Sequence, residues 1–491
     1  MTKIEVSNRR DFLRLSAGAL GFSLLPSGLL FSDLVRASNQ AQRVQTLVIG
    51  GGLAGLSTAR NLVQMGQDSV VVLEARKRVG GRTLNLPLPG GHVVEGGGEW
   101  IGPGQDRIAA MASELGVGTF DAFYQGDGFY EIQGLVSKGL LPEISIQQGY
   151  DFTRLAWRLQ SMADNLPAGN PWQAANARYL DSMTLAQWLK NEGASDWTID
   201  AFRIITRAIM SGYPERISLL WFMHYIQSSG GLLASALNDN GLQDLRFVGG
   251  SQLVSIKAAE ALGGRVHLDE PVISINDQAA GPVEVQTHKG VYLADRVVVA
   301  MAPADTLRIN FKSGLTPQRE SLVKQWAGLT RLPLIKHSVI YKTPFWREAG
   351  LNGNVVTDHS PLQLVFDNSP HDASLGVLTT FLSAAEVPAM ASKTDRARLI
   401  PKELSRYFGS KALHTLGNVE KDWSTDPWSI GCITPLTKGI LTSAGPALRE
   451  PVGRIHWAGT ESAEVGCGYM DGAVRSGERA AKEVYNGTLT S

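Results

Sequence analysis

Glycine residues at a fixed spacing give the clearest chemical signal in this 491-residue chain. Gly50, Gly52 and Gly55 directly follow the apolar run at residues 44–49, "VQTLVI". A glycine turn of this kind lets backbone N–H groups approach a pyrophosphate, and the positive end of a following helix adds to the attraction. Glu74, 24 residues after Gly50, can accept hydrogen bonds from ribose hydroxyls and would repel a 2′-phosphate. These residues predict a dinucleotide-binding site.

Three predicted elements position these residues. The run 44–49 has the length and apolar character of a strand buried on both faces, and residues 56–65 show helical spacing. A second buried strand is expected at residues 70–73, closed by Glu74. The order strand, glycine turn, helix, strand is that of a βαβ unit in an α/β fold. Because nicotinamide and flavin dinucleotides share this unit, the residues beyond it must decide between them.

Two further glycine segments follow, "EARKRVGGRT" at residues 74–83 and "VVEGGGEWIGP" at residues 93–103. Together with the first turn they resemble the flavin-containing amine oxidases, in which a GGR segment follows the ribose-binding acid. The resemblance implies FAD as the cofactor, with Arg82 neutralising the pyrophosphate, although a loop arginine can also be a solvated charge. It also implies that residues 93–103, the third glycine segment of the chain, lie against the flavin ring. The implied cofactor-binding residues of the two segments are Arg76, Gly81, Arg82, Gly98, Glu99 and Trp100.

Further matches to the monoamine oxidase branch follow in the family's order. "MTLAQWLK", "ISLLWFMHYIQSSGG" and "LRFVGGSQLV" occupy the middle of the chain. "LGGRVHLDEPVISI" contains a strand that enters the flavin domain, with Val272 as a cofactor-binding residue, and the hairpin "VEVQTHKGVYLADRVVVAMAP" comes next. "IHWAGTESAEVGCGYMDGAVRSGERAAKEV" resembles the closing flavin segment, with Gly459, Glu461 and Met470 as cofactor-binding residues. A helix from about residue 471 would point its N-terminus at the flavin.

The resemblance covers residues 44–488 and implies a two-domain α/β fold. A Rossmann-like FAD-binding domain would be interleaved with an α+β substrate domain. The expected FAD-binding segments are residues 44–116, 248–322 and 426–488, and the expected substrate-binding segments are residues 117–247 and 323–425. Mitochondrial members of the family end in an anchoring helix, whereas this chain stops at "YNGTLTS", so no C-terminal membrane anchor is expected.

Two residues would carry the chemistry, which moves a hydride equivalent from the α-carbon of a neutral amine to flavin N5. Lys336 in "LPLIKHSVIYK" matches the family lysine that holds a water near N5 and assists reoxidation. Because a lysine in an alternating strand usually points to solvent, a surface position stays open. Tyr469 in "GCGYMDGA" matches one of two aromatic rings that flank the substrate nitrogen. The other ring's position holds Ile433, which keeps the site dry but removes an electron-rich face.

Four more residues are implied to lie around the substrate and the flavin. Gln243 in "NGLQDLRF" falls on the family's pocket glutamine, with a surface loop amide as the alternative. Ala208 and Ile209 in "TRAIMSG" would line the entrance cavity, although core packing explains them equally well. Trp423 is expected to pack near the flavin, as wall or as core. An apolar, aromatic-lined site disfavours the ammonium form of an amine by desolvation.

The two cysteines, Cys432 and Cys467, are too few for a disulfide framework or a cysteine metal cluster. "WSIGCITPLTKGIL" resembles the segment in which monoamine oxidases join a cysteine sulfur to the flavin's 8α-methyl carbon, so covalent FAD attachment through Cys432 is favoured. A packed, inert thiol and a Cys432–Cys467 disulfide formed after export stay open. The nine histidines show no ligand-like spacing, and no metal site is expected.

The composition bears on which macromolecules the protein binds, and the N-terminal residues bear on its cellular compartment. Lys plus Arg and Asp plus Glu both number 46, so no basic field for nucleic acid is indicated. Paired Arg9 and Arg10 precede a modest apolar run that Pro26 interrupts, and residues 1–37 resemble a twin-arginine (Tat) export signal. That address implies contact with the Tat machinery and a periplasmic location. An N-terminal membrane anchor and cytoplasmic residence stay open.

The resemblance implies a FAD-dependent amine oxidase. Such an enzyme converts an amine to an imine, which hydrolyses to a carbonyl compound and ammonia, while O2 becomes hydrogen peroxide. Three alternatives stay open: an amine dehydrogenase that passes electrons to a cytochrome, an L-amino acid oxidase, and a flavin-bound protein without turnover. No arginine for a substrate carboxylate is identified, and a scaffold would need neither Lys336 nor Tyr469. The amine's identity and the oligomeric state, including a homodimer, are left open.

Overall fold

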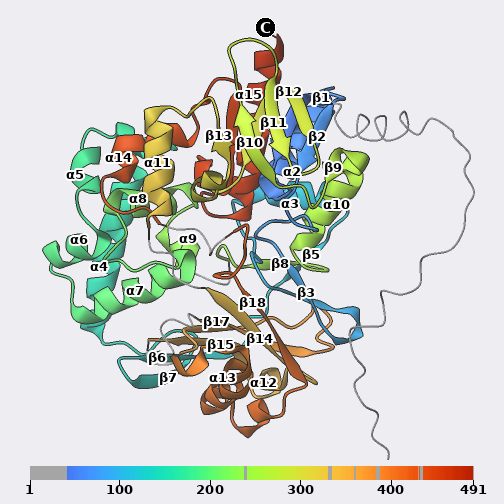
Figure 1. Ribbon diagram of the computed structural model, residues 1–491. Helices are drawn as coiled ribbons and strands as arrows, with labels where there is room; N and C mark the ends of the chain where they lie inside the picture. Colours follow the sequence, from blue (N-terminus) through green and yellow to red (C-terminus); the bar gives the residue numbers. More distant parts are fainter. Residues whose placement is uncertain are drawn as a thin grey trace, which may run out of the picture. The chain divides into compact units, whose positions relative to one another are not determined.

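The computed structural model describes residues 41–236, 240–329, 334–358, 361–382, 388–429, 431 and 435–489. The predicted export signal at residues 1–37 and two predicted site residues, Cys432 and Ile433, lie outside the described residues. From residue 42 onward the chain packs as one unit, in which two separate sheets carry most of the strands (Figure 1).

The first sheet is built around the predicted glycine-turn unit. β1 (Gln42–Ile49) runs parallel to β12 (Val291–Ala300) on one side and to β2 (Val70–Leu73) on the other. The order is β13-β10-β11-β12-β1-β2-β9, and β19 pairs with β12. All of β2 and most of β1 are buried, as expected for parallel strands with both faces covered. The other strands are β9 (Val266–His267), β10 (Val272–Asn276), β11 (Val283–Thr287), β13 (Asn310–Phe311) and β19 (Ile455–Ala458).

Two helices from opposite ends of the chain, α2 and α15, pack side by side on this sheet (Figure 1). Their approach is close because a Cβ at Gly477 would lie only 2.3 Å from the Ala54 carbonyl oxygen. The Ser57 hydroxyl also donates to the Val474 carbonyl oxygen at 3.0 Å. The helices of this part are α2 (Leu53–Gln64), α3 (Asp106–Glu114), α10 (Gln252–Leu262) and α15 (Met470–Leu489).

The second sheet contains β14 (Ile335–Tyr341), the strand that carries Lys336. β14 lies between β17 and β18, is antiparallel to both, and has all seven residues buried. The order is β18-β14-β17-β16-β15-β6-β7, and α12 and α13 pack against this sheet (Figure 1). The other elements are β6 (Asp127–Ile132), β7 (Leu135–Gly139), β15 (Leu351–Thr357), β16 (Leu364–Asp367), β17 (Gly376–Leu382), β18 (Gly417–Asp422), α12 (Phe345–Glu348) and α13 (Lys393–Phe408).

A separate helical core surrounds α8 (Leu219–Ser228), in which every residue except Gln227 is buried. A helix that is apolar on all sides belongs in an interior. The helices around it are α4 (Ile146–Asp164), α5 (Ala177–Asp181), α6 (Leu185–Asn191), α7 (Asp196–Met210), α9 (Leu232–Ala236), α11 (Pro317–Ala327) and α14 (Ile440–Ala444). Two short strand pairs complete the fold: β3 (Asn85–Pro87) with β4 (Val93–Glu95), and β5 (Thr119–Asp121) with β8 (Leu245–Phe247).

The predicted α/β fold class is confirmed. The expected hairpin is the antiparallel pair β11–β12, and the helix expected from about residue 471 is α15. The helix predicted at residues 56–65 instead begins at Leu53, because the helix starts inside the glycine motif. Strands of the first sheet fall in the predicted FAD-binding segments, apart from the start of β1, and strands of the second fall in the predicted substrate-binding segments. The domain boundaries themselves stay a prediction.

No described helix is both long and apolar enough to cross a membrane. Within the described ranges, no group of three or more His, Cys, Asp or Glu side chains is arranged to hold a metal ion.

Candidate active site

The first glycine turn admits no side chain at Gly50 or Gly55. Gly50 has a φ of +113°, and a Cβ there would lie 2.6 Å from the carbonyl oxygen of Ala300 in β12. A Cβ on Gly55, in the first turn of α2, would lie 1.9 Å from the Gly50 carbonyl oxygen. Gly52 caps α2 without a side-chain hydrogen bond, and the first turn contains no acidic residue. The N–H groups and positive dipole end of α2 are therefore available to a phosphate.

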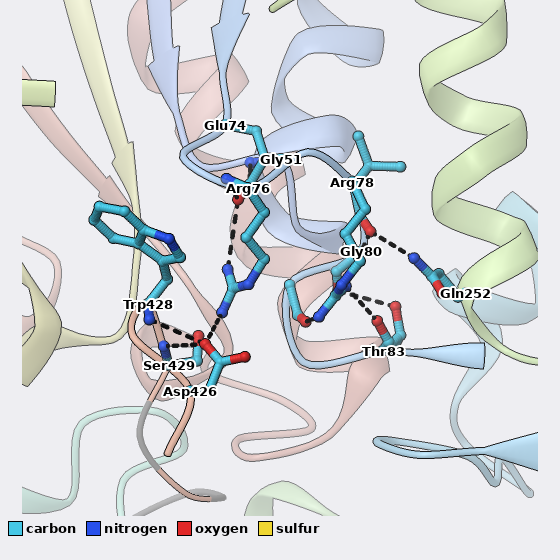
Figure 2. Close-up of polar contacts among 12 residues, drawn as sticks. Gly51, Glu74, Arg76, Arg78, Gly80, Thr83, Gln252, Asp426, Trp428 and Ser429 are labelled. Atoms are coloured by element: carbon cyan, nitrogen blue, oxygen red, sulfur yellow. Dashed lines mark hydrogen bonds and ion pairs between the residues drawn. The ribbon is translucent and has the colours of Figure 1, made fainter. Parts of the chain in front are cut away.

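Glu74 lies beside this turn and is oriented by the backbone (Figure 2). One carboxylate oxygen accepts the N–H of Gly51 at 2.8 Å, and the other accepts the N–H of Arg76 at 2.8 Å. Because an ionised carboxylate has about four acceptor sites, these bonds leave capacity for ribose hydroxyls. The arrangement is compatible with the ribose contact predicted for Glu74.

Arg76 joins the glycine turn to a distant part of the chain (Figure 2). Its guanidinium donates to Asp426 at 2.7 Å, and Asp426 also accepts the N–H groups of Trp428 and Ser429 and the Lys421 ammonium. Burial alone would raise the pKa of Asp426, but these hydrogen bonds and the charges of Arg76 and Lys421 lower it to about 2. Arg76 therefore acts in this structure as a structural link as well as a predicted cofactor contact.

The second glycine segment packs directly on the first. The N–H of Gly80 donates to the Gly51 carbonyl oxygen at 2.8 Å, and a Cβ on Gly81 would lie 3.4 Å from the Cα of Gly52. Arg78, which the sequence pattern did not single out, holds this loop by donating to three of its backbone carbonyl oxygens (Figure 2). The two segments form a cradle of backbone atoms.

Arg82 forms a bidentate ion pair with Glu461, at 2.6 and 3.1 Å. Glu461 is buried, whereas the Arg82 side chain is 31% exposed. Gly459 lies beside this pair, with a φ of +138° and a hypothetical Cβ 3.5 Å from the Glu461 carboxylate. The structure thus brings three predicted cofactor residues together, and it balances the charge of Arg82 with a carboxylate. The predicted contact of Arg82 with pyrophosphate stays a prediction.

The third glycine segment meets two of the residues predicted to lie near the flavin ring. A Cβ on Gly98 would lie 3.5 Å from the sulfur of Met470, at the start of α15. A Cβ on Gly97 would lie 3.0 Å from the Trp423 ring, and Trp423 donates to the Gly96 carbonyl oxygen at 2.7 Å. Glycine is required at Gly97 in any case, because its Cβ would also lie 2.0 Å from the Arg82 carbonyl oxygen.

Lys336 is buried next to this segment, so the solvent-facing alternative is wrong. Its side chain is 2% exposed, because β14 is an interior strand covered on both faces. The ammonium forms an ion pair with Glu99 and donates to the Gly97 carbonyl oxygen at 3.2 Å. The rings of Trp100 and Phe381 lie 5.0 and 5.5 Å from it. The structure therefore places the predicted catalytic lysine against Gly97, Glu99 and Trp100.

Tyr469 packs against a second aromatic ring that the sequence pattern did not single out, Tyr225 of α8. The two ring centroids lie 5.5 Å apart at an interplanar angle of 36°, and the Tyr225 hydroxyl donates to the Ile209 carbonyl oxygen at 2.9 Å. Ile209 packs on the helical core, and Ala208 beside it is half-buried, so both positions fit the core alternative as well as the entrance role. Because α8 is apolar on all sides, its sequence has no face that would mark Tyr225.

Gln243 and Val272 are placed by contacts of their backbone. Gln243 is half-buried in a turn, and its carbonyl oxygen accepts the Tyr124 hydroxyl at 2.7 Å. Val272 begins β10, just after Glu270, whose N–H donates to the Glu74 carbonyl oxygen at 2.9 Å. Val272 is thus two residues along the chain from a backbone contact with Glu74, the predicted ribose-binding acid. Gln243 is held through its main-chain carbonyl oxygen.

Cys467 is a free, buried thiol, which speaks against the Cys432–Cys467 disulfide. Burial raises the pKa of the Cys467 thiol, as expected for a packed and inert cysteine. The attachment predicted for Cys432 and the substitution noted at Ile433 both fall outside the described residues.

Comparisons with known proteins agree with this geometry. The family model described as flavin containing amine oxidoreductase matches residues 53–485. A protein of Mycobacterium tuberculosis assigned as a flavin-containing monoamine oxidase is 37% identical over 455 residues, covering 92% of this chain and 99% of its own length. Putrescine oxidase bound to putrescine matches with a TM-score of 0.83 and 30% identity, over 91% of this chain and 100% of its own. Cyclohexylamine oxidase from Brevibacterium oxydans matches with a TM-score of 0.84 and 28% identity, over 91% and 99%.

A glycine-lined dinucleotide cradle next to a buried lysine defines a flavin-dependent oxidoreductase. The chain belongs to the flavin-containing amine oxidoreductase family. It is a flavin amine oxidase, an enzyme that catalyses oxidative deamination. The residues present fit FAD, because both glycine loops exclude side chains and the N-terminus of α2 is open to an anion.

Proposed function

We propose that this flavin amine oxidase oxidises a neutral amine bound beside Tyr469 and uses O2 as its electron acceptor. The amine R–CH2–NH2 loses two electrons and two protons to give an imine, and water converts the imine to a carbonyl compound and ammonia. O2 takes up the two electrons and two protons as hydrogen peroxide. The observation that carries the proposal is the buried ammonium of Lys336, held against Gly97 and Glu99.

The residues of the chain have separate tasks in this reaction. When bound, FAD supplies the acceptor for the hydride equivalent. The N-terminus of α2 binds its pyrophosphate and Glu74 its ribose. Tyr469 and Tyr225 offer an apolar surface on which desolvation disfavours the ammonium form of the amine. Lys336 holds a proton donor beside the Gly97 carbonyl oxygen, and reoxidation of a bound flavin by O2 would use such a donor.

Primary amines with an alkyl or ring substituent are the proposed substrate class. The support is the apolar packing around Tyr469 and the likeness to a putrescine oxidase and a cyclohexylamine oxidase. An anaerobic flavin-reduction screen with primary, secondary and aromatic amines and L-amino acids tests it, with air admitted afterwards. Bleaching by an amine and rapid recovery in air would support the oxidase. Slow recovery would favour a dehydrogenase that donates electrons to a cytochrome, and bleaching by L-amino acids alone would favour an L-amino acid oxidase.

Replacement of Lys336 tests the role of its ammonium directly. Lys336→Met keeps the length and apolar stem of the side chain but removes the charge. We expect the purified variant to stay yellow and to reoxidise in air about 100-fold more slowly, the lower end of the loss typical of removing a positioned proton donor. Stopped-flow absorbance after anaerobic reduction measures this rate. Reoxidation at the wild-type rate would show that the lysine is not needed.

Covalent attachment of FAD through Cys432 is proposed as well. The cysteine's place in a segment that resembles the family's attachment site supports it, and a putrescine oxidase variant with alanine replaced by cysteine belongs to a redesign of cofactor binding. In forming the thioether, the thiol and the 8α-methyl group each lose one hydrogen, and the two electrons released pass to the flavin and then to O2. Acid-precipitated wild type should keep its yellow colour and Cys432→Ser should lose it. Colour in the wild-type supernatant would contradict the linkage.

We also propose periplasmic residence after export of the folded holoenzyme by the twin-arginine route. The support is the Arg9-Arg10 pair before a weakly apolar run in residues 1–37. Cell fractionation of the wild type and of the Arg9→Lys/Arg10→Lys variant tests the address. Export of the variant, or wild type confined to the cytoplasm, would contradict it.

A further inference from the structure

Four charged side chains form a buried cluster behind the third glycine segment: Glu95, Glu99, Arg246 and Lys336. Each is at most 4% exposed. Glu99 pairs with Lys336 through one carboxylate oxygen, and its other oxygen lies 2.9 Å from Nε of Arg246. Arg246 also binds Glu95 at 2.8 Å. Two carboxylates and two cations give a formal charge of zero.

The position of Glu99 is set by groups other than Lys336. The side-chain amide of Asn368 donates at 3.0 Å to the same oxygen that binds the lysine. Arg246 is itself anchored, because its guanidinium donates to the carbonyl oxygens of Ser369 at 2.8 Å and Asn368 at 3.3 Å. The carboxylate of Glu99 is therefore fixed from β8 and from the segment after β16. Lys336, on a long flexible stem, is the partner that is positioned.

The charge of Lys336 also depends on this carboxylate. A lysine buried among aromatic rings without a counter-ion tends to lose its proton. Among the described residues, Glu99 is the one carboxylate within ion-pair distance of Lys336. Burial raises the pKa of Glu99, and the positive charges of Lys336 and Arg246 act against this rise. For Arg246, burial opposes the charge, but Glu95 and Glu99 outweigh it and raise its pKa.

We propose that Glu99 is a positioning residue whose direct ion pair holds the Lys336 ammonium beside Gly97 and keeps it charged, with Arg246 and Glu95 completing a neutral cluster. An ammonium has three hydrogens, and the contacts with Glu99 and Gly97 use two, so the third can serve a group on the flavin side. The inference rests on the role proposed for Lys336 and adds a residue that acts through it.

Glu99→Gln tests the proposal, because the amide keeps the size of the side chain and can still accept from Asn368. The visible spectrum of the oxidised holoenzyme is titrated from pH 6 to 10, and reoxidation in air is followed over the same range after photoreduction. In Glu99→Gln, both should show a midpoint at a lower pH than in the wild type, because the buried ammonium has lost its counter-ion. The midpoint should vanish in the Lys336→Met/Glu99→Gln double variant.

Two further variants act as controls. Glu131 is another buried carboxylate, 3% exposed, that pairs with Arg406 at 2.8 Å and accepts the Tyr407 hydroxyl in the second sheet. Glu131→Gln should lower the thermal stability without moving the midpoint. Glu99→Asp keeps the charge at a greater distance and should give an intermediate midpoint. If Glu99→Gln does not fold, Glu99→Asp tests the proposal by itself. An unchanged midpoint in Glu99→Asp would then overturn the proposal.

A wild-type midpoint in Glu99→Gln, or a shifted midpoint that survives in the double variant, would overturn the inference. The spectral titration separates this failure from that of the proposed function. If Lys336→Met reoxidises at the wild-type rate while the spectral midpoint still moves in Glu99→Gln, the role of the lysine fails and its positioning by Glu99 stands.

Discussion

The dinucleotide end and the reacting end of the site differ in the groups that form them: backbone atoms at the first and charged side chains at the second. The dinucleotide end consists of glycine backbone, where Gly50 and Gly55 lie so close to neighbouring carbonyl oxygens that a Cβ would fall within 2.6 and 1.9 Å of them. The reacting end consists of charged side chains, with Glu99, Arg246 and Lys336 each at most 4% exposed. At the first end a Cβ on Gly50 or Gly55 would collide with backbone, and at the second end a missing charge would leave a buried partner uncompensated.

This difference follows from what each end must do. A pyrophosphate is bound through backbone N–H groups, which every residue except proline carries, so the requirement is close approach rather than a particular side chain. At the reacting end, the proton donor is the ammonium of Lys336, and the group that holds it is the carboxylate of Glu99. Both are charged and buried away from solvent. Such a charge is stable only if partners of opposite sign are buried with it.

The largest effect is expected from a methyl group at the dinucleotide end. In Gly55→Ala, the Cβ would collide with the Gly50 backbone, so α2 must move away from the phosphate-binding turn. We expect a protein that is purified without bound flavin, measured by the ratio of visible to ultraviolet absorbance. Gly264→Ala is the matched control, because a Cβ there meets no atom within 4 Å. Full flavin content in Gly55→Ala would mean that close approach is not what the glycine provides.

A smaller effect is expected from loss of one charge at the reacting end. Arg246→Met leaves Glu95 and Glu99 buried without their shared partner, which costs about 3–5 kcal/mol of folding free energy. For a chain of this length, that corresponds to a fall of roughly 3–5 °C in the melting temperature. Differential scanning calorimetry of the holoenzyme measures it.

Arg406→Met is the matched control for this comparison. Arg406 also pairs with a buried carboxylate, Glu131, but its own side chain is 42% exposed. Its loss should cost about 1 kcal/mol or less, because water can replace the guanidinium. Equal losses of folding free energy in Arg246→Met and Arg406→Met would show that the buried charge cluster stabilises the fold no more than a partly exposed ion pair does.

The dinucleotide end could be predicted from the sequence because its signal is local. The glycine turn, both strands and Glu74 lie within residues 44–74, and each glycine has its own steric reason at its own position. The largest difference from the predicted boundaries is the start of α2, which begins at Leu53 because Gly55 belongs to the helix as well as to the turn. Local patterns describe such a unit well, because its contacts form between near neighbours in the chain.

The charge cluster could not be predicted in this way. Its members come from three separate segments, at residues 95–99, 246 and 336, and Asn368 adds a fourth, so no local pattern contains it. Each charged residue, taken alone, is typical of a solvated surface, which is why a surface position had to stay open for Lys336. Only the folded structure, in which β14 is buried along its whole length and Lys336 pairs with Glu99, shows that the lysine points into the protein.

The smallest effect concerns Asp426, which ties the dinucleotide end to the segment after β18. The pKa of Asp426 is lowered from its usual 3.8 to about 2. A carboxyl with a lower pKa in the folded state stabilises the fold above its unfolded pKa, and this contribution is lost as the pH falls from about 4 to about 2. The shift corresponds to about 2 kcal/mol at neutral pH, which Asp426→Asn should lose.

Asp151→Asn is the control that separates an effect on stability from an effect on the dinucleotide site. The pKa of Asp151 is also lowered to about 2: burial opposes the shift, and hydrogen bonds from Ser195, Thr198 and Arg154 outweigh it. Denaturant unfolding between pH 7 and pH 3 should lose part of its acid dependence in both variants. Only Asp426→Asn, made in the folded Cys432→Ser protein, should also release FAD more readily on dilution, because Asp426 holds Arg76 beside the ribose-binding acid. Equal flavin retention in both variants would confine Asp426 to a purely structural role.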